Sequence, residues 1–514
     1  MEKSRLFANA ENMAVRWIRG IGIVFFSLLC VASLLFTRYF PADYAQEIPY
    51  NRIVFFPLTL LGAMLLAAGV WWLGERVMRD PGKAERNLRF LLYGVLAWIL
   101  IGGVWWVRIS GCTPVSDQMM VLTSAQRFSE GNYGRLDYGK YLFMHPHQLG
   151  LTAYEELVFR IFGRENLTAL LLLQVAGIAG AVYFGYRITR YLFSEARVAA
   201  NYLILAGLCF PFLLYCTYFY GDVPAVVLSL LAVWQLLRYV KEGKRSSLVL
   251  LVLGVSLAVL IRNNSVIVLI ACACVLAVKA ISDRRVEYLL CIALLLAGMF
   301  AGRQGLRLFY ERRCGHEINE GMPMVLYIAM GMQEGDKEAG WYNGYNMYTY
   351  QDVCLYHGPT AAELGKAEIR ARAKELLLHP AYGADFYWRK FSSQWSEPTY
   401  GCFIMTYAAE NGRGGFARNV YEGGVNRVLT SFMDSYQLLI YGAALLLLIS
   451  RRKKREPLEN EILLIVILGG ILFHMLWEAK SRYVLPYFVM MLPLAAAGIC
   501  EVTQKIQKRG KGKG

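Results

Sequence analysis

The stretch ILLIVILGGILFHMLWEAKSRYVLPYFVMMLPLAAAGIC, residues 462–500, holds two apolar runs separated by a short charged segment. Each run approaches the roughly 20 residues that a helix needs to cross a bilayer. Glu478, Lys480 and Arg482 lie between the runs, and an ionisable side chain at the bilayer centre costs roughly 2.5–3.5 kcal/mol on insertion scales. The pattern predicts two membrane-spanning helices joined by a charged turn, whose charges need a counterpart.

The rest of the chain repeats this apolar pattern. Of its 514 residues, 56% are hydrophobic and only 18% are charged. These features predict an all-α polytopic membrane protein with about twelve transmembrane helices, interfacial helices and a mostly helical or loop-rich outer domain. The first span is too long for a cleaved signal, so we expect it to be retained. The predicted spans begin near Val15, Ile53, Phe90, Leu167, Ala199, Val223, Leu248, Ser265, Val286, Tyr436, Glu461 and Tyr483.

The net charge of +16 follows the predicted topology. With the N-terminus in the cytoplasm, the inner segments carry about 29 Lys and Arg residues and the short outer connections about five, which is the positive-inside bias. No basic stretch is interleaved with stacking aromatic residues, so we expect no nucleic-acid partner. The basic tail is expected to contact anionic membrane lipids.

An even number of spans leaves both termini in the cytoplasm and two long segments outside. We divide the chain into N-terminal transmembrane helices (1–107), a first outer loop with a candidate catalytic acid and interfacial helices (108–165), central transmembrane helices (166–302), a large outer loop domain (303–430), C-terminal transmembrane helices (431–500) and a basic cytoplasmic tail (501–514). The lean loops and basic tail indicate a multi-pass protein of a bacterial plasma membrane.

In the first outer segment, Asp117 follows the end of a span by a few residues, and Pro114 sets a turn before it. The Asp117 carboxylate should therefore lie at the membrane–water boundary. Amphipathic patterns predict one interfacial helix after Asp117 and a second, LGLTAYEELVFRIF, after Pro146. A lone Asp at such a position is also typical of a helix cap, so both roles stay open.

Further charged residues fall on the same predicted outer side. Asp222, in the short turn YGDVP, either caps the next helix or joins a site. Arg262 interrupts the apolar run SLAVLIRNNSVIVLI and is either a snorkelling arginine or a ligand contact. Lys480 and Arg482 either anchor helix ends at the boundary or bind the same ligand.

Carboxylates with a cluster of Arg and Lys at a membrane boundary suit a phosphate ester on a lipid. Arginine presents a planar fork of donors to phosphate oxygens, and lysine adds a compact charge. An acid among such cations stays ionised and can act as a base. The residues fit a transfer reaction in which phosphate leaves, Asp117 takes the proton of the attacking group, and the cations stabilise the departing phosphate.

The order of these features resembles the GT-C superfamily of polytopic glycosyltransferases, in particular the family 39 branch with protein O-mannosyltransferases, aminoarabinose transferases and bacterial RgtA/B/C/D-like enzymes. The resemblance extends from about Trp105 to Ile499. It depends on four places in this order: the SDQ of the first outer loop, HPHQLG before an interfacial helix, the YGD turn, and the closing EAKSRYVLPY.

The resemblance implies an inverting transfer of a monosaccharide from a polyprenyl-phosphate donor on the non-cytoplasmic face. The acceptor would be a glycan, a glycolipid or a protein. Asp117 would then be the catalytic base and Asp222 a second acid of the site. The implied donor-phosphate contacts are Arg262, Lys480, Arg482, His145 and His147.

Two departures from the family pattern limit these implications. Many protein mannosyltransferases carry Asp-Glu where this chain has Asp117-Gln118, and His-Pro-Pro where it has His145-Pro146-His147. The missing second acid puts in doubt both a protein acceptor and a metal that bridges two carboxylates. His145 and His147 either contact the donor phosphate or turn the chain, and no third ligand accompanies them for a metal. We therefore expect no required cofactor, and a divalent metal is unsupported.

The second outer segment contains YIAMGMQEGDKEAGWYNGYNMYTYQD, which is rich in aromatic residues and glycine. Its candidate contacts for the acceptor or sugar are Trp341, Tyr342 and Asn343, with ordinary loop packing as the alternative. Glu478 and Tyr483 of the charged turn join them as candidates. A helix from about Thr360 to Leu378, followed by a second amphipathic helix, is predicted further along.

Two rival functions remain for a chain of this kind. A flippase or transporter of polyprenyl-linked lipids would also place charges within a helical bundle, but transporters often show internal repeats and midplane charges. This sequence shows neither. The third alternative is a lipid-binding scaffold without catalysis.

Overall fold

The computed structural model describes residues 2–39, 50–52, 56–406 and 415–511. Every predicted span coincides with a helix or a bent pair of helices, because each apolar run is long enough to satisfy its own backbone hydrogen bonds in a bilayer. These are α1 (Glu2–Leu35), α2 (Phe56–Val77), α3 (Ala84–Ser110), α7 (Leu167–Leu192), α8 (Ala196–Gly207) with α9 (Phe210–Leu214), α10 (Asp222–Glu242), α11 (Arg245–Ile261), α12 (Val266–Ser282), α13 (Glu287–Cys314), α20 (Gly424–Arg451), α21 (Ile462–Leu476) and α22 (Leu485–Lys511).

Ten helices in the described part of the chain are long and apolar enough to cross a membrane, and the bent pair α8–α9 brings the number to eleven. Helix α11, with 17 residues, is a shorter apolar helix at the remaining predicted position. The predicted start at Ile53 lies outside the described residues. The all-α polytopic fold is confirmed, and a two-stranded antiparallel hairpin of β1 (Thr37–Tyr39) and β2 (Tyr50–Arg52) is a small addition to it.

The bundle is built around α22, whose residues 485–500 are almost all buried. It packs closely on α20, because a Cβ at Gly498 would overlap the carbonyl of Ala443. Helices α2, α3 and α13 instead expose large apolar side chains, among them Trp98, Ile101 and Leu290. Exposed apolar faces of this extent suit contact with lipid tails.

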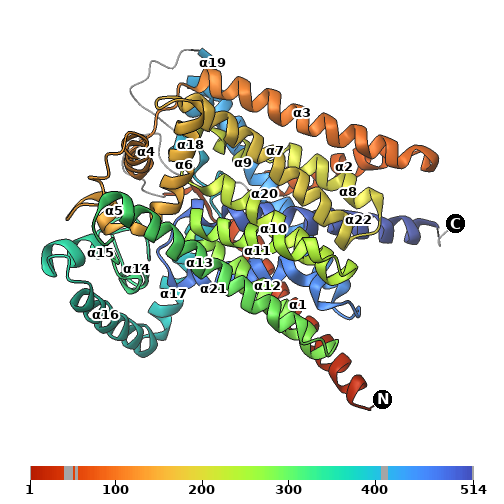
Figure 1. Ribbon diagram of the computed structural model, residues 1–514. Coiled ribbons are helices and arrows are strands. Elements are labelled where there is room, and N and C mark those ends of the chain that lie inside the picture. Colours follow the sequence, from red (N-terminus) through yellow and green to blue (C-terminus); the bar gives the residue numbers. More distant parts are fainter. Residues whose placement is uncertain (1, 40–49, 53–55, 407–414, 512–514) are drawn as a thin grey trace.

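The remaining helices gather at the end of the bundle opposite the two chain termini (Figure 1). We call this end the site end and the other the terminal end. The site end comprises α4 (Ser116–Ser129), α5 (Tyr141–Met144), η3 (Pro146–Gln148), α6 (Leu149–Phe162), α14 (Met324–Gly331), α15 (Tyr345–Met347), η6 (Tyr348–Val353), α16 (Gly358–Leu378), α17 (Pro380–Trp395), α18 (Cys402–Thr406) and α19 (Gly415–Glu422).

The predicted non-spanning helices are present at this end as α4, α6, α16 and α17. The 14 residues of α6 are too few to span. Helix α6 packs on α4 and on the end of α11, where a Cβ at Gly150 would overlap the carbonyl of Leu260. Short turns between long helices are η2 (Pro81–Lys83), η4 (Tyr215–Thr217), η5 (Asn263–Ser265), η7 (Leu458–Glu461) and η8 (Ser481–Val484).

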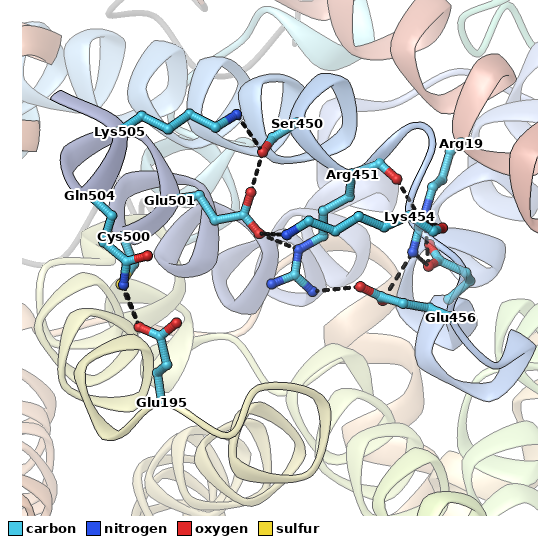
Figure 2. Close-up of polar contacts among 11 residues, drawn as sticks. Arg19, Glu195, Ser450, Arg451, Lys454, Glu456, Cys500, Glu501, Gln504 and Lys505 are labelled. Carbon is cyan, nitrogen blue, oxygen red and sulfur yellow. Dashed lines mark hydrogen bonds and ion pairs between the residues drawn. The ribbon is translucent and has the colours of Figure 1, made fainter. Parts of the chain in front are cut away.

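A set of ion pairs closes the terminal end (Figure 2). Arg19 of α1 is buried, and its Nη2 lies 2.5 Å from Glu461 and 2.9 Å from Glu456. Arg451, at the end of α20, lies between Glu501 and Glu456, at 2.5 Å and 3.2 Å. We call Arg19, Arg451, Lys454, Glu456, Glu461 and Glu501 the terminal-end cluster.

Candidate active site

The YGD turn holds a buried ion pair. Gly221 adopts a φ of +84°, which glycine tolerates, and Asp222 then begins α10. An Asp222 oxygen lies 3.0 Å from Nη2 of Arg262, whose Nη1 donates to the carbonyl of Tyr220 at 3.0 Å. Asp222 is buried, yet its other oxygen has no hydrogen-bond partner within the described residues. Gly221 holds the N-cap position of α10 and no side-chain capping bond is made there, so Asp222 lies in the first turn and is not the cap.

Arg482 enters the same region from η8. Its Nη1 donates to the hydroxyl of Tyr218, while its buried Nε has no hydrogen-bond partner in the part of the chain that the structure describes. The guanidinium carbon lies 5.1 Å from the ring centre of Tyr220 and 5.2 Å from that of Tyr483. Arg262 lies over the same two rings, at 5.4 Å and 5.8 Å. Two arginines that are 220 residues apart in sequence therefore share two aromatic rings.

A small cavity of about 30 Å³ lies beside the Asp222–Arg262 pair. Its polar side is formed by this pair, and Val226, Val268 and Met490 contribute apolar walls from α10, α12 and α22.

Asp117 stands at the start of α4, near the tyrosines that surround the two arginines. We call the region around Asp117, Arg262, Arg482 and these tyrosines the chamber. The Asp117 side chain is exposed, and its charge reaches the buried tyrosines around the two arginines. Burial is the main reason why the pKa of Tyr141 and of Tyr220 lies above its ordinary value, and the Asp117 carboxylate adds to the rise in both. The same holds for Tyr327, where burial comes first and the carboxylates of Glu478 and Asp117 contribute. Asp117 and the arginines therefore lie at one end of the bundle, around one group of buried tyrosines.

The HPHQ stretch forms another wall of the chamber. Nδ1 of His145 lies 3.3 Å from the hydroxyl of Tyr327, and Gln148 donates to the hydroxyl of Tyr220 at 2.8 Å. Burial, and then the charges of His145, Arg262 and Arg303, lower the pKa of His147 to about 3. His147 is therefore a neutral imidazole near neutral pH, able to donate or accept a hydrogen bond without adding charge.

The residues of the charged turn lie together. Glu478 is buried, and the hydroxyl of Tyr483 donates to it over a long 3.5 Å. Lys480 is half-buried and precedes η8. Tyr327 stacks on Trp477 with ring centres 5.3 Å apart and an angle of 6°, which joins α14 to the end of α21.

The three candidate residues of the second outer segment lie in different surroundings. Trp341 is buried, bridges to Ala479 and donates through Nε1 to Ser393 at 2.9 Å. Asn343 donates to Gln333 at 3.0 Å, within its own loop. Tyr342 keeps 42% of its surface exposed. The burial of the remainder, and then the charges of Glu478 and Asp117, raise its pKa, so its phenol borders the chamber.

Four neighbours of the site escaped the sequence analysis. Tyr218 and Tyr220 belong to the aromatic run TYFYGD, and their closeness to Asp222 was the available signal. The sequence offered no comparable signal for Tyr327 or Arg303. The Nη2 of Arg303, on α13, donates to Asn263 at 2.9 Å, which brings a further cation beside His147.

The described residues contain no group of three or more His, Cys, Asp or Glu side chains arranged to hold a metal ion. The arrangement they do form is a carboxylate at the rim of a tyrosine-lined chamber and arginines at its buried side. That combination can accept a proton at the rim and stabilise negative charge inside.

Residues 147–303 match the family model described as dolichyl-phosphate-mannose-protein mannosyltransferase. The matched part includes His147, Asp222 and Arg262, whereas Asp117 and Arg482 lie outside it. No curated protein matches the chain. No solved structure matches it either. The family match and the ten candidate spans together support the interpretation of this chain as a GT-C mannosyltransferase-like membrane protein.

Proposed function

We propose that the chain transfers a monosaccharide from a polyprenyl-phosphate donor to an acceptor on the non-cytoplasmic membrane face, with inversion at the anomeric carbon. The acceptor is a glycan, a glycolipid or a protein. In this proposal both termini lie in the cytoplasm of a bacterial cell, and anionic lipids contact the basic tail. The coarser part, a GT-C-type glycosyltransferase that uses a polyprenyl-phosphate sugar, is supported by the family match.

The single observation that carries the proposal is that Asp117, Arg262 and Arg482 gather around the same buried tyrosines, Tyr218 and Tyr483. The two guanidinium groups lie over the same rings of Tyr220 and Tyr483, and the Asp117 charge acts on Tyr220. Arginine pairs of this kind suit phosphate oxygens. In this proposal, the apolar side chains of Val226, Val268 and Met490, which lie beside the Asp222–Arg262 pair, contact the first part of the polyprenyl chain.

In the proposed reaction, a hydroxyl or amine of the acceptor attacks the anomeric carbon of the donor sugar. The proton of the attacking group passes to Asp117. The bond between that carbon and the phosphate oxygen breaks, and its electron pair leaves with the polyprenyl phosphate. Arg482 and Arg262 stabilise the added negative charge, so the proposed chemistry requires no metal.

Substitution of the proposed base tests this function. Asp117→Asn removes the proton acceptor and should lower transfer by about 10²–10⁴, the range typical of general bases. The assay is transfer from a panel of polyprenyl-phosphate sugars to added acceptors by the protein reconstituted in liposomes.

Asp137→Asn is the matched control, because Asp137 is an exposed acid of the same outer segment and pairs with His316. It should keep transfer within about twofold. Full transfer by Asp117→Asn would exclude Asp117 as the base. A wild-type protein that consumes no donor but moves polyprenyl lipid between leaflets would instead establish the transporter alternative.

A further inference from the structure

A buried lysine outside the chamber is not used by the proposed reaction. Lys390 of α17 has no exposed surface, and its amine donates to the carbonyl of Gly331. Lysine is almost never fully buried unless it is paired, because removing its charge from water is costly. The carboxylate whose charge acts on Lys390 is that of Glu478.

Lys390 lies against a loop, residues 331–342, that has no room for more side chains. A Cβ at Gly331 would overlap the backbone of Leu476 and Trp477. A Cβ at Gly340, whose φ is +70°, would overlap the Gly331 carbonyl and the methylenes of Lys390. The lysine stem therefore packs against Gly340, and its amine lies at the Gly331 carbonyl.

The loop is also joined to the charged turn by its backbone. Ala479 donates its N–H to the carbonyl of Gly340 at 2.8 Å, and Trp341 bridges to Ala479 in parallel. On the other side, Trp341 bonds to Ser393 of α17 at 2.9 Å. Helix α17, the loop and the turn thus form three layers. Tyr342, which follows Trp341, and Glu478, which precedes Ala479, both border the chamber.

We propose that Lys390 is a positioning residue for the acceptor side of the site. It holds the loop 331–342 against residues 477–479 and thereby sets the positions of Tyr342 and Glu478. This role in transfer depends on the function proposed above.

The charges around Lys390 predict how opening of the loop depends on pH. Burial lowers the pKa of Lys390 from 10.5 to about 7, and Glu478 opposes the change. His474 of α21 also faces the amine. On α17, the neighbouring Arg389 binds Glu334, Glu338 and Asp385 instead.

Opening of the loop would return Lys390 to water and raise its pKa again. Between about pH 7 and pH 10 the open form then binds a proton that the closed form lacks. Raising the pH therefore disfavours opening, by up to about tenfold per pH unit.

Hydrogen exchange of the wild-type protein in lipid nanodiscs tests this directly. Peptides that cover 331–342 and 477–481 are followed from about pH 7 to about pH 9, after correction for intrinsic exchange. We expect the opening equilibrium to fall by at least about fivefold over this interval. A flat opening equilibrium in the wild type would overturn the role of Lys390.

Two variants sharpen the result. Lys390→Met keeps the length of the side chain but removes the donor and the charge, so it should open more often and show no response to pH. Arg389→Met loosens the outer edge of the same loop and should retain the pH response. If Lys390→Met keeps that response, the proposal is wrong.

Transfer assays separate the two proposals. For Lys390→Met we expect the KM for the acceptor to rise about tenfold while binding of polyprenyl phosphate stays within about twofold of the wild type. Equal acceptor KM values would exclude a positioning role in transfer. A wild-type protein that neither transfers sugar nor binds polyprenyl phosphate would refute the proposed function, whereas hydrogen exchange would still decide whether Lys390 holds the loop.

Discussion

Both ends of the bundle contain buried arginines, but the hydrogen-bond partners of these arginines differ. At the terminal end, Arg19 directs every nitrogen to an oxygen, including carboxylates of Glu461 and Glu456 and the carbonyls of Arg451 and Lys454. At the site end, Arg482 bonds to one phenol and lies over aromatic rings, and its Nε has no hydrogen-bond partner in the described ranges.

The difference shows how stabilising charges can be told from functional ones. A buried charge is tolerated when its attraction and hydrogen bonds offset the loss of hydration. The terminal-end cluster meets that condition by itself (Figure 2). The chamber does not, since Arg482 and Asp222 keep unused polar atoms. Perturbed and incompletely paired charges are typical of sites that complete their interactions with a ligand.

The strongest way to break this comparison is Arg482→Met. If the unused donors of Arg482 serve the leaving phosphate, kcat/KM should fall about 10³-fold, equivalent to roughly 4 kcal/mol. The melting temperature should change little. Arg451→Met at the terminal end is the control and should keep transfer by the folded protein within about fivefold. Equal losses for both variants would remove the distinction between the two ends.

Arg19→Met tests the opposite side of the comparison. It leaves Glu461 and Glu456 without their buried partner, which should cost about 3 kcal/mol of stability. Thermal unfolding in detergent measures the loss, and transfer per folded molecule should be unchanged. A variant as stable as the wild type would show that the terminal-end cluster contributes no net stability.

Asp222→Asn sharpens the assignment within the chamber. Asparagine keeps the shape but removes the charge that holds Arg262, so binding of the donor should weaken about 10- to 100-fold, roughly 2 kcal/mol. The measurement is the KM for the polyprenyl-phosphate sugar. An unchanged KM would remove Asp222 from donor binding and leave it only the ion pair with Arg262.

The smallest effect is expected for His147→Gln. Because the pKa of His147 is lowered to about 3 in the folded protein, the unfolded chain binds more protons between about pH 6.5 and pH 3. The wild type should therefore lose stability as the pH falls through this window, by up to about 1.4 kcal/mol per unit. The variant should lose less, as measured by unfolding at pH 7 and pH 5. Identical acid sensitivity would show that His147 is not buried as a neutral ring.

The sequence predicted the helices better than the site. Amphipathic spacing predicted α4, α6, α16 and α17, because that pattern is local. Side-chain direction in a loop is not local. Trp341 and Tyr342 are neighbours, yet one packs against α17 and the other borders the chamber. Arg303 was missed because a cation at the end of an apolar helix has several common roles.

By itself, the sequence determined that this chain crosses the membrane many times, where each span lies, and which charges stand near span ends, because apolar length and charge placement act over about 20 residues. Only the tertiary structure decided which of these charges meet. Arg262 and Arg482 share two rings, while Arg19 and Glu461 neutralise each other, and nothing within either local segment distinguishes them. The physical reason is that pairing depends on how distant helices pack, and packing is a property of the whole bundle.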